Sequence, residues 1–205
     1  MPSVKIAPIN GETYHVFNRG VDKRDIFLDR YDYIRFYQSL DYFNSVKPTK
    51  NFRYAKAQSE ENANIERLVE IQAYSLLPNH YHVLVKQLTE RGLGEFLRRV
   101  SSGYTSYFNE KYIRSGTLFQ GTFKRIHIES QEQLQYLFAY VNENQFVHGV
   151  TKKRELYQSS SLHYQGKRKS RLISKENKGY YPYSENIALA QSIFAKRETM
   201  KDLLD

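Results

Sequence analysis

Two histidines that stand two residues apart, His80 and His82, have a spacing that could do chemistry. They lie in the stretch His80-Tyr81-His82-Val83-Leu84-Val85, which is rich in β-forming residues and predicts a strand. Because side chains alternate across a strand, the two imidazoles share one face and could bind one divalent metal ion. The alternative is a pair of half-exposed histidines without a chemical role.

Tyr140 and Asn144 form a second pair with a suggestive spacing. They stand four residues apart in an apolar-periodic segment that predicts a helix over about residues 131–144, so they would share a helical face. A tyrosine can act as a covalent nucleophile, and an amide oxygen one turn later could be a third metal ligand. The chain contains 18 tyrosines, so a packing role for Tyr140 is the alternative.

Composition excludes several classes of site. The chain has no cysteine, which rules out disulfides, thiolate metal sites and cysteine nucleophiles. It contains no His-Glu-x-x-His, no phosphate loop of the Gly-x-x-x-x-Gly-Lys type, no Gly-x-Gly-x-x-Gly and no Gly-x-Ser-x-Gly. No apolar run approaches the roughly 20 residues of a membrane helix, and no signal peptide is expected. We therefore expect a cytoplasmic, nucleoid-associated protein without a membrane partner.

The net charge of +9 points to an anionic polymer as the partner. The positive charge lies mainly in the second half and is densest over residues 167–171. Such a cluster is either a solvated basic tail or a set of phosphate contacts that carry no sequence information.

The coarse pattern predicts an α+β fold. Strands are expected over residues 13–18, 71–77, 80–86 and 123–128, and helices over 29–44, 93–112 and 131–144, with Asp29 and Ser130 as N-caps. Residues 45–64 are polar and predict a loop, and Pro78-Asn79 predicts a hairpin turn. This order predicts a ferredoxin-like (split βαβ) antiparallel sheet with helices on one face and an additional C-terminal helix that bears Tyr140. We expect a domain over 1–150 and a basic, partly helical, DNA-contacting extension over 151–205, with a last helix from 184 to about 204.

The ordered motifs resemble the single-tyrosine HUH transposases. Residues 77–85, Leu-Pro-Asn-His-Tyr-His-Val-Leu-Val, resemble the family's Met-Pro-Asn-His-hydrophobic-His-Leu-Leu-Val signature. The segments 15–20, 121–124, 140–144 and 148–149 fall in the family's order. The chain is most similar to the REP-associated tyrosine transposases, relatives of small insertion-sequence transposases, over residues 12–165. It departs from the family at Leu77, at Tyr81, and at Asn-Gln-Phe over 144–146, where the family has Asn-Pro-Val.

The resemblance implies a transposase or endonuclease that nicks and rejoins single-stranded DNA at hairpin-associated sites, with Mg²⁺ or Mn²⁺ as the cofactor. It implies that His80, His82 and Asn144 bind the metal and that Tyr140 forms a covalent 5′-phosphotyrosine intermediate. We expect the DNA contacts to come from Asn18, Arg19, Arg98, Arg99, Lys124, Arg125, Lys167, Arg168, Lys169 and Arg171.

Two other functions stay open. One is a domesticated protein that binds hairpin DNA or RNA on the same fold without cleaving it. The other is a relaxase of the HUH superfamily, in which the histidine motif usually follows the tyrosine, whereas here His80 precedes Tyr140. The sequence does not distinguish a monomer from a homodimer, and it names neither the target sequence nor a general base.

Overall fold

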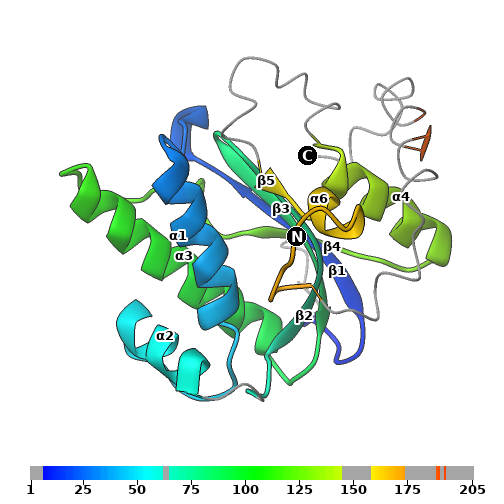
Figure 1. Cartoon of the computed structure of the whole chain (residues 1–205), viewed down its shortest axis with the longest axis horizontal. Coiled ribbons are helices and arrows are strands. Elements are labelled where there is room, and N and C mark those ends of the chain that lie inside the picture. The colour runs from blue at the N-terminus through cyan, green and yellow to red at the C-terminus, as the bar shows by residue number, and fades with distance from the viewer. Residues whose placement is uncertain (1–6, 62–64, 145–157, 174–187, 190–191, 193–205) are drawn as a thin grey trace, which may run out of the picture.

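The computed structural model of the chain describes residues 7–61, 65–144, 158–173, 188–189 and 192 (Figure 1). Its centre is a sheet of five strands in the order β4-β1-β3-β2-β5, in which every neighbouring pair is antiparallel. The strands are β1 (Thr13–Arg19), β2 (Val69–Leu77), β3 (His80–Gln87), β4 (Lys124–His127) and β5 (Gln158–Ser159). The predicted antiparallel α+β fold is thereby confirmed.

Helices lie on both sides of this sheet. Figure 1 shows α1 (Arg30–Tyr42), α2 (Phe52–Glu61) and α3 (Gly92–Lys111) on one side. On the other side lie α4 (Gln131–Asn142), which carries Tyr140, and the short α6 (Ser161–Tyr164). A 3-10 turn, η1 (Val21–Lys23), follows β1. The tyrosine-bearing helix is therefore separated by the sheet from the two long helices of the ferredoxin-like core.

The alternation along β3 directs different side chains to the two sides. Tyr81, Val83 and Val85 are fully buried in the larger core under α1 and α3. Leu84 belongs instead to the smaller core under α4. Since alternate residues share a face, His80 and His82 lie on the α4 side with Leu84. The tight turn at Pro78 and Asn79 joins β2 and β3 with Leu77 opposite His80, as predicted for a hairpin.

A buried carboxylate joins α1 to α3. Asp29 caps α1 by accepting hydrogen bonds from the backbone N–H groups of Tyr31 and Asp32, as predicted for an N-cap. The fully buried Asp32 carboxylate accepts from Lys111 Nζ at 2.7 Å and from the Tyr112 hydroxyl at 2.8 Å. Because a buried charge is tolerated only when it is paired, these bonds fix the two helices relative to each other.

The prediction of a loop over residues 45–64 was wrong. The structure forms α2 within this range, and only Ala55 and Ser59 of the helix are buried. The ring of Phe52 packs edge-on against Tyr42, and the Arg35 guanidinium lies 3.2 Å from its centroid. The composition of this helix is mostly polar, which explains why the sequence did not indicate it.

Two other predictions cannot be compared with the fold. The boundary at residues 150 and 151 lies outside the described residues, as does nearly all of the last helix predicted from 184 to about 204. Within the described ranges, no helix combines the length and apolar character needed to cross a bilayer.

A glycine in α3 provides a test of the packing between α1 and α3. A Cβ atom on Gly103 would lie 2.6 Å from the buried Phe43 ring, whereas one on Gly94 of the same helix would meet nothing within 4 Å. We expect Gly103→Ala to lower the free energy of unfolding by about 1–3 kcal/mol through overpacking. Gly94→Ala should leave it unchanged or raise it by up to about 1 kcal/mol. Urea unfolding of both variants checks this, and equal stability of the two would contradict the close packing.

Candidate functional site

The predicted metal pair lies near the start of the central strand. His80 is half-buried and His82 is 2% exposed. Their ring centroids are 5.1 Å apart, and the ring planes are nearly perpendicular at 84°. Two imidazoles so placed can direct nitrogens toward one ion from different directions.

The Nδ1 atom of each ring is held by a hydrogen bond within the protein. His80 Nδ1 lies 2.6 Å from Asn79 Oδ1, and His82 Nδ1 lies 2.9 Å from His15 Nε2. An amide oxygen can only accept, so His80 Nδ1 carries the proton in the first bond. In neutral His80 the lone pair is then on Nε2, the form in which histidine binds a metal.

His15 is a buried histidine that the sequence analysis did not assign to the site. It is fully buried on β1, and its ring stacks on His82 with the planes at 14° and the centroids 5.1 Å apart. Burial lowers the pKa of His15 to about 3, so the ring is neutral at physiological pH. The alternation His15, Phe17, Arg19 along a predicted strand could have indicated its face, but not the register that sets His15 beside His82.

The predicted nucleophile packs against these histidines. The Tyr140 side chain, on α4, is fully buried. Its ring meets His82 edge-on with centroids 5.4 Å apart, and it meets His15 in the same way at 6.2 Å. The structure therefore brings Tyr140 to the predicted metal pair, while its role as a nucleophile stays a prediction.

Asn144, the predicted third ligand, lies just beyond α4. The helix ends at Asn142, and Glu143 is its C-cap with φ −107° and ψ 18°. The Asn144 side chain is fully buried, and neither amide atom has a hydrogen-bond partner among the described residues. A buried amide without a partner is costly, and a bound ion or substrate would supply one.

Imidazole nitrogens and an amide oxygen are both ligand types found at divalent-metal sites. Across the described part of the chain, no group of three or more His, Cys, Asp or Glu residues could hold a metal ion. His80, His82 and Asn144 would supply two imidazoles and one amide oxygen, and their joint role as ligands stays a prediction. Mg²⁺ and Mn²⁺ commonly complete such a set with water or phosphate oxygens.

Residues beyond 157 hold the end of the tyrosine helix. The Ser160 hydroxyl donates to Asn142 Oδ1 at 2.6 Å, and its oxygen accepts from the Tyr74 backbone N–H on β2 at 3.0 Å. The Ser161 hydroxyl donates to Glu143 Oε1 at 2.7 Å. We call these contacts the α4 clamp, because they join the C-terminal end of the helix to β2 and to the segment after β5.

Two of the predicted DNA contacts lie beside the histidines. Exposed Arg19 is the direct cross-strand partner of His80. Exposed Lys124 is the partner of Phe17, and its Nζ atom lies 5.6 Å from the Phe17 ring centroid. Because cross-strand partners share a face, both cations lie on the side of the sheet that carries the metal pair.

The strand pairing directs two other predicted contacts away from the histidines. Asn18 pairs with Tyr81, and its side-chain amide donates to the Gly121 carbonyl at 3.2 Å. Arg125 pairs with Val16, whose side chain belongs to the larger core. The structure therefore gives Asn18 a role in holding the turn at Gly121.

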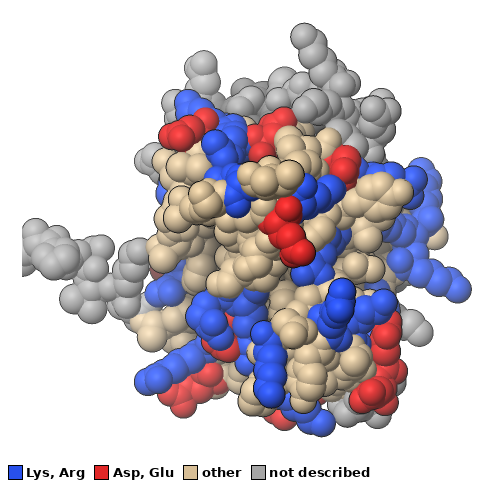
Figure 2. All heavy atoms as spheres, turned by 90° about the vertical axis from the view of Figure 1, so that its left-hand side faces the viewer, with Lys and Arg blue, Asp and Glu red and all other residues tan. Residues whose placement is uncertain are grey.

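Arg98 and Arg99 lie on α3, across the sheet from the histidines. Both side chains form ion pairs with Glu95, at 2.8 and 2.7 Å. These bonds lower the pKa of Glu95 to about 2. Figure 2 shows the face formed by this side of the molecule, where Lys and Arg alternate with acidic residues. The structure does not bring this pair to the metal site.

The basic cluster at 167–171 extends from the β5 edge toward α1 and α2. The Arg168 guanidinium lies 5.4 Å from the Tyr37 ring centroid. Arg171 bonds to the Ser59 hydroxyl at 3.2 Å and to the Asp41 carboxylate at 3.4 Å. Lys167 and Lys169 are exposed. Two of these four cations therefore have structural partners.

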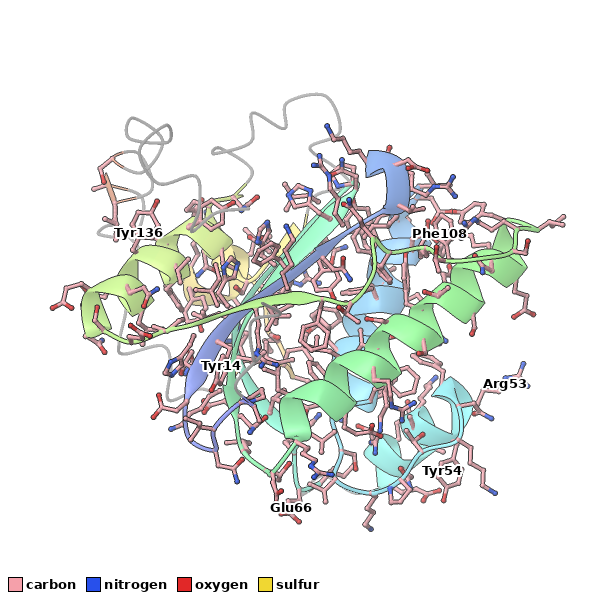
Figure 3. The ribbon with its side chains drawn as sticks, turned by 180° about the vertical axis from the view of Figure 1, so that it is seen from behind. Tyr14, Arg53, Tyr54, Glu66, Phe108 and Tyr136 are labelled. Atoms are coloured by element: carbon pink, nitrogen blue, oxygen red, sulfur yellow. The ribbon has the colours of Figure 1, made fainter. Side chains whose placement is uncertain are left out.

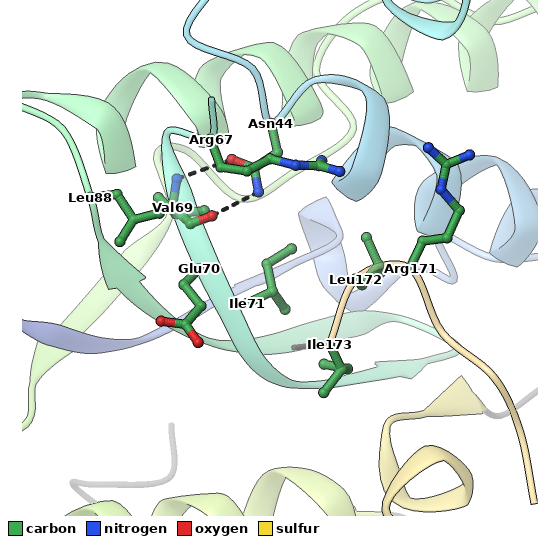
Figure 4. A pocket seen from close by; sticks show the side chains of 9 residues that line it. All are labelled: Asn44, Arg67, Val69, Glu70, Ile71, Leu88, Arg171, Leu172 and Ile173. Atoms are coloured by element: carbon green, nitrogen blue, oxygen red, sulfur yellow. Dashed lines mark hydrogen bonds between the residues drawn. The ribbon is translucent and has the colours of Figure 1, made fainter. Parts of the chain in front are cut away.

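A pocket at the start of β2 is distinct from the histidine site (Figure 4). It is lined by Asn44, Arg67, Val69, Glu70, Ile71, Leu88, Arg171, Leu172 and Ile173. Asn44 bonds to both backbone groups of Val69, and Arg67 and Arg171 bond to Asp41. These polar side chains therefore form bonds within the protein, at the place where residues 171–173 pack against β2.

Comparison with known proteins gives a match in structure alone. No protein-family model and no curated protein sequence matches the chain. A solved structure described as a REP-associated tyrosine transposase bound to a REP hairpin is similar to it, with a TM-score of 0.60 and 17% sequence identity. The match covers 89% of this chain and 90% of that one. The resemblance predicted from the motifs is thereby confirmed at the level of the fold.

The α4 clamp contains a carboxyl group with a testable pH dependence. Burial raises the pKa of Glu143, although the Ser161 bond opposes the change, so the folded state holds its proton more tightly than the unfolded chain does. This contribution to stability is full below the unfolded pKa, near 4.5, and is lost as the pH rises through the raised value. We expect Glu143→Gln to remove that decline and to be more stable than wild type at neutral pH.

Thermal unfolding between pH 4 and 8 checks this expectation. Glu132→Gln, an exposed change in the first turn of α4, is the matched control, because the pKa of Glu132 is lowered by its backbone and Ser130 bonds. At neutral pH, Glu132→Gln should be less stable than wild type, whereas Glu143→Gln should be more stable. If the stabilities of wild type and Glu143→Gln change with pH in the same way, the expected contribution of the Glu143 proton to stability would be contradicted.

Proposed function

We propose that this chain is a metal-dependent tyrosine transesterase that nicks and rejoins single-stranded DNA at hairpin-associated sites. The observation that carries the proposal is the packing of the Tyr140 ring against buried His82, with His80 on the same face. The similar fold of a solved structure described as a REP-associated tyrosine transposase bound to a REP hairpin supports the same class of function.

His80, His82 and Asn144 would hold Mg²⁺ or Mn²⁺ in this proposal. The bound ion would offset negative charge on the scissile phosphate. The Asn79 bond would support this role, because it holds the proton of neutral His80 on Nδ1 and leaves the lone pair on Nε2. The buried Asn144 amide, which lacks a partner among the described residues, would gain one.

Tyr140 would act as the nucleophile. Its Oη atom would form a bond to phosphorus as the bond from phosphorus to the 3′ oxygen breaks, which leaves a 5′-phosphotyrosine and a 3′-OH. The phenol loses its proton and the 3′ oxygen gains one. Because the phosphoester is conserved, a 3′-OH can reverse the attack and join strands without ATP.

A fully buried Tyr140 cannot meet a phosphate in the arrangement described. The proposed reaction therefore requires α4 to shift from the sheet before attack. The hydroxyls of Ser160 and Ser161 in the α4 clamp are the contacts that such a shift would strain or break.

The same burial favours a second candidate function. A protein that binds hairpin DNA without cutting it would keep Tyr140 as a core residue beneath His15 and His82. The two candidates share the fold and the basic residues, and they differ in whether a covalent product forms.

A pair of tyrosines on α4 separates these functions. We expect Tyr140→Phe to abolish a metal-dependent covalent adduct with labelled single-stranded hairpin DNA. Tyr136→Phe, one turn earlier on the same helix (Figure 3), should retain it. Denaturing gels with Mn²⁺ or Mg²⁺ measure the adduct. Tight binding without an adduct in wild type, across a set of hairpins, would instead support the binding protein.

The two cations beside the histidines should bind the DNA backbone. We expect Arg19→Ala and Lys124→Ala each to weaken hairpin binding several-fold and to reduce the slope of log K against log salt by about 1. Lys56→Ala on α2, where Lys56 pairs with Glu60, is the control and should leave binding unchanged. Fluorescence anisotropy over a salt series measures both quantities. An unchanged slope in both variants would place the phosphates elsewhere on the surface.

A further inference from the structure

Among the residues that the structure describes, His15 is the one buried histidine in contact with the proposed site that has no role in the function above. We propose that His15 is a positioning residue, which accepts a hydrogen bond from His82 Nδ1 and so presents His82 Nε2 to the metal. This inference rests on the proposed function, because it assigns a role within the same metal site.

The geometry leaves His82 little freedom. His82 is the cross-strand partner of Phe17, and His15 stands two residues before Phe17 on the same face of β1. The His82 ring stacks on His15 at 5.1 Å and on Phe17 at 5.6 Å. The Tyr140 ring contacts it edge-on. Stacking fixes the ring plane, and the 2.9 Å bond to His15 fixes the rotation within that plane.

Metal binding permits only one direction for this bond. An imidazole that binds a metal through Nε2 carries its proton on Nδ1, so His82 must be the donor. His15 Nε2 must then be the acceptor, and His15 carries its own proton on Nδ1. If His15 donated instead, the His82 proton would be on Nε2, where it would block the metal.

The two predicted ligands are then supported in the same way by different residues. Asn79 accepts from His80 Nδ1 at the hairpin turn, and His15 accepts from His82 Nδ1 on the neighbouring strand. Outer partners of this kind set the tautomer and orientation of a ligand, and their loss commonly costs 10- to 100-fold in metal affinity. His15 is not itself a ligand in this arrangement, since its Nε2 atom is engaged by His82.

The wild-type protein alone gives the first test. Nitrogen-15 NMR of histidine-labelled, metal-free protein reports which ring nitrogen carries the proton, with His15→Gln and His82→Gln used to assign the signals. We expect His82 to be protonated on Nδ1 and His15 on Nδ1. Protonation of His82 on Nε2 would overturn the proposal without any requirement that a variant fold.

Mn²⁺ titration of the full chain gives the second test. We expect His15→Leu to weaken binding by 10- to 100-fold and His15→Gln, whose amide oxygen can accept from His82, to restore part of the loss. His127→Gln, a half-exposed histidine on β4 that bonds to Glu12, is the control and should match wild type. Wild-type affinity in His15→Leu would overturn the role of His15.

The same titration separates this inference from the function on which it rests. If wild type binds Mn²⁺ and His82→Ala abolishes binding, the metal site stands whatever His15 does. If wild type and His82→Ala bind Mn²⁺ equally, the proposed metal site is wrong, and the role of His15 falls with it.

Discussion

The pairing of β3 with β1 on one side and β2 on the other is the constraint on which the rest of the structure depends. It places His80 and His82 at the middle of a sheet that is covered on both faces. Every second residue of β3 belongs to the aromatic and aliphatic core under α1 and α3. Both histidines consequently lie on the α4 side, where the buried His82 contacts His15 and Tyr140. A shift of one residue in this register would exchange the two faces and bury both imidazoles among apolar side chains.

The sequence predicted the parts of this arrangement that depend on local pattern. The hairpin followed from Pro78-Asn79 between two β-rich stretches, and the start of α1 followed from Asp29. The bond between His15 and His82 was beyond such reasoning, because it depends on the register between β1 and β3, which the local pattern does not determine. The ion pairs of Arg98 and Arg99 with Glu95 could have been predicted, since Glu95 stands three and four residues before them on a helix. The helix α2 was missed because its composition is mostly polar, and its contacts to Arg35 and Tyr42 depend on the tertiary structure.

The two faces of the sheet are held by different kinds of interaction. On the α1 and α3 side, a large apolar cluster is combined with the buried Asp32 and its bonds to Lys111 and Tyr112. On the α4 side, the apolar cluster is smaller, and buried polar groups of Asn142, Glu143, Ser160 and Ser161 carry much of the contact. Regions with fewer buried apolar contacts open at lower free energy than the main core. The tyrosine helix is therefore better placed than α1 or α3 to move while the rest of the domain stays intact.

If the proposed function is right, the burial of Tyr140 would limit the cleavage of DNA that is not the substrate. A phenol with no accessible surface is harmless to every phosphodiester that touches the protein only from outside. For the proposed chemistry, a substrate has to release enough binding energy to lift α4 before any bond is at risk. In this proposal, loose electrostatic association with random sequence would not meet that threshold, whereas binding of a folded hairpin that fits the surface would meet it. The free energy needed to expose Tyr140 would then discriminate between substrate and non-substrate DNA before the chemical step.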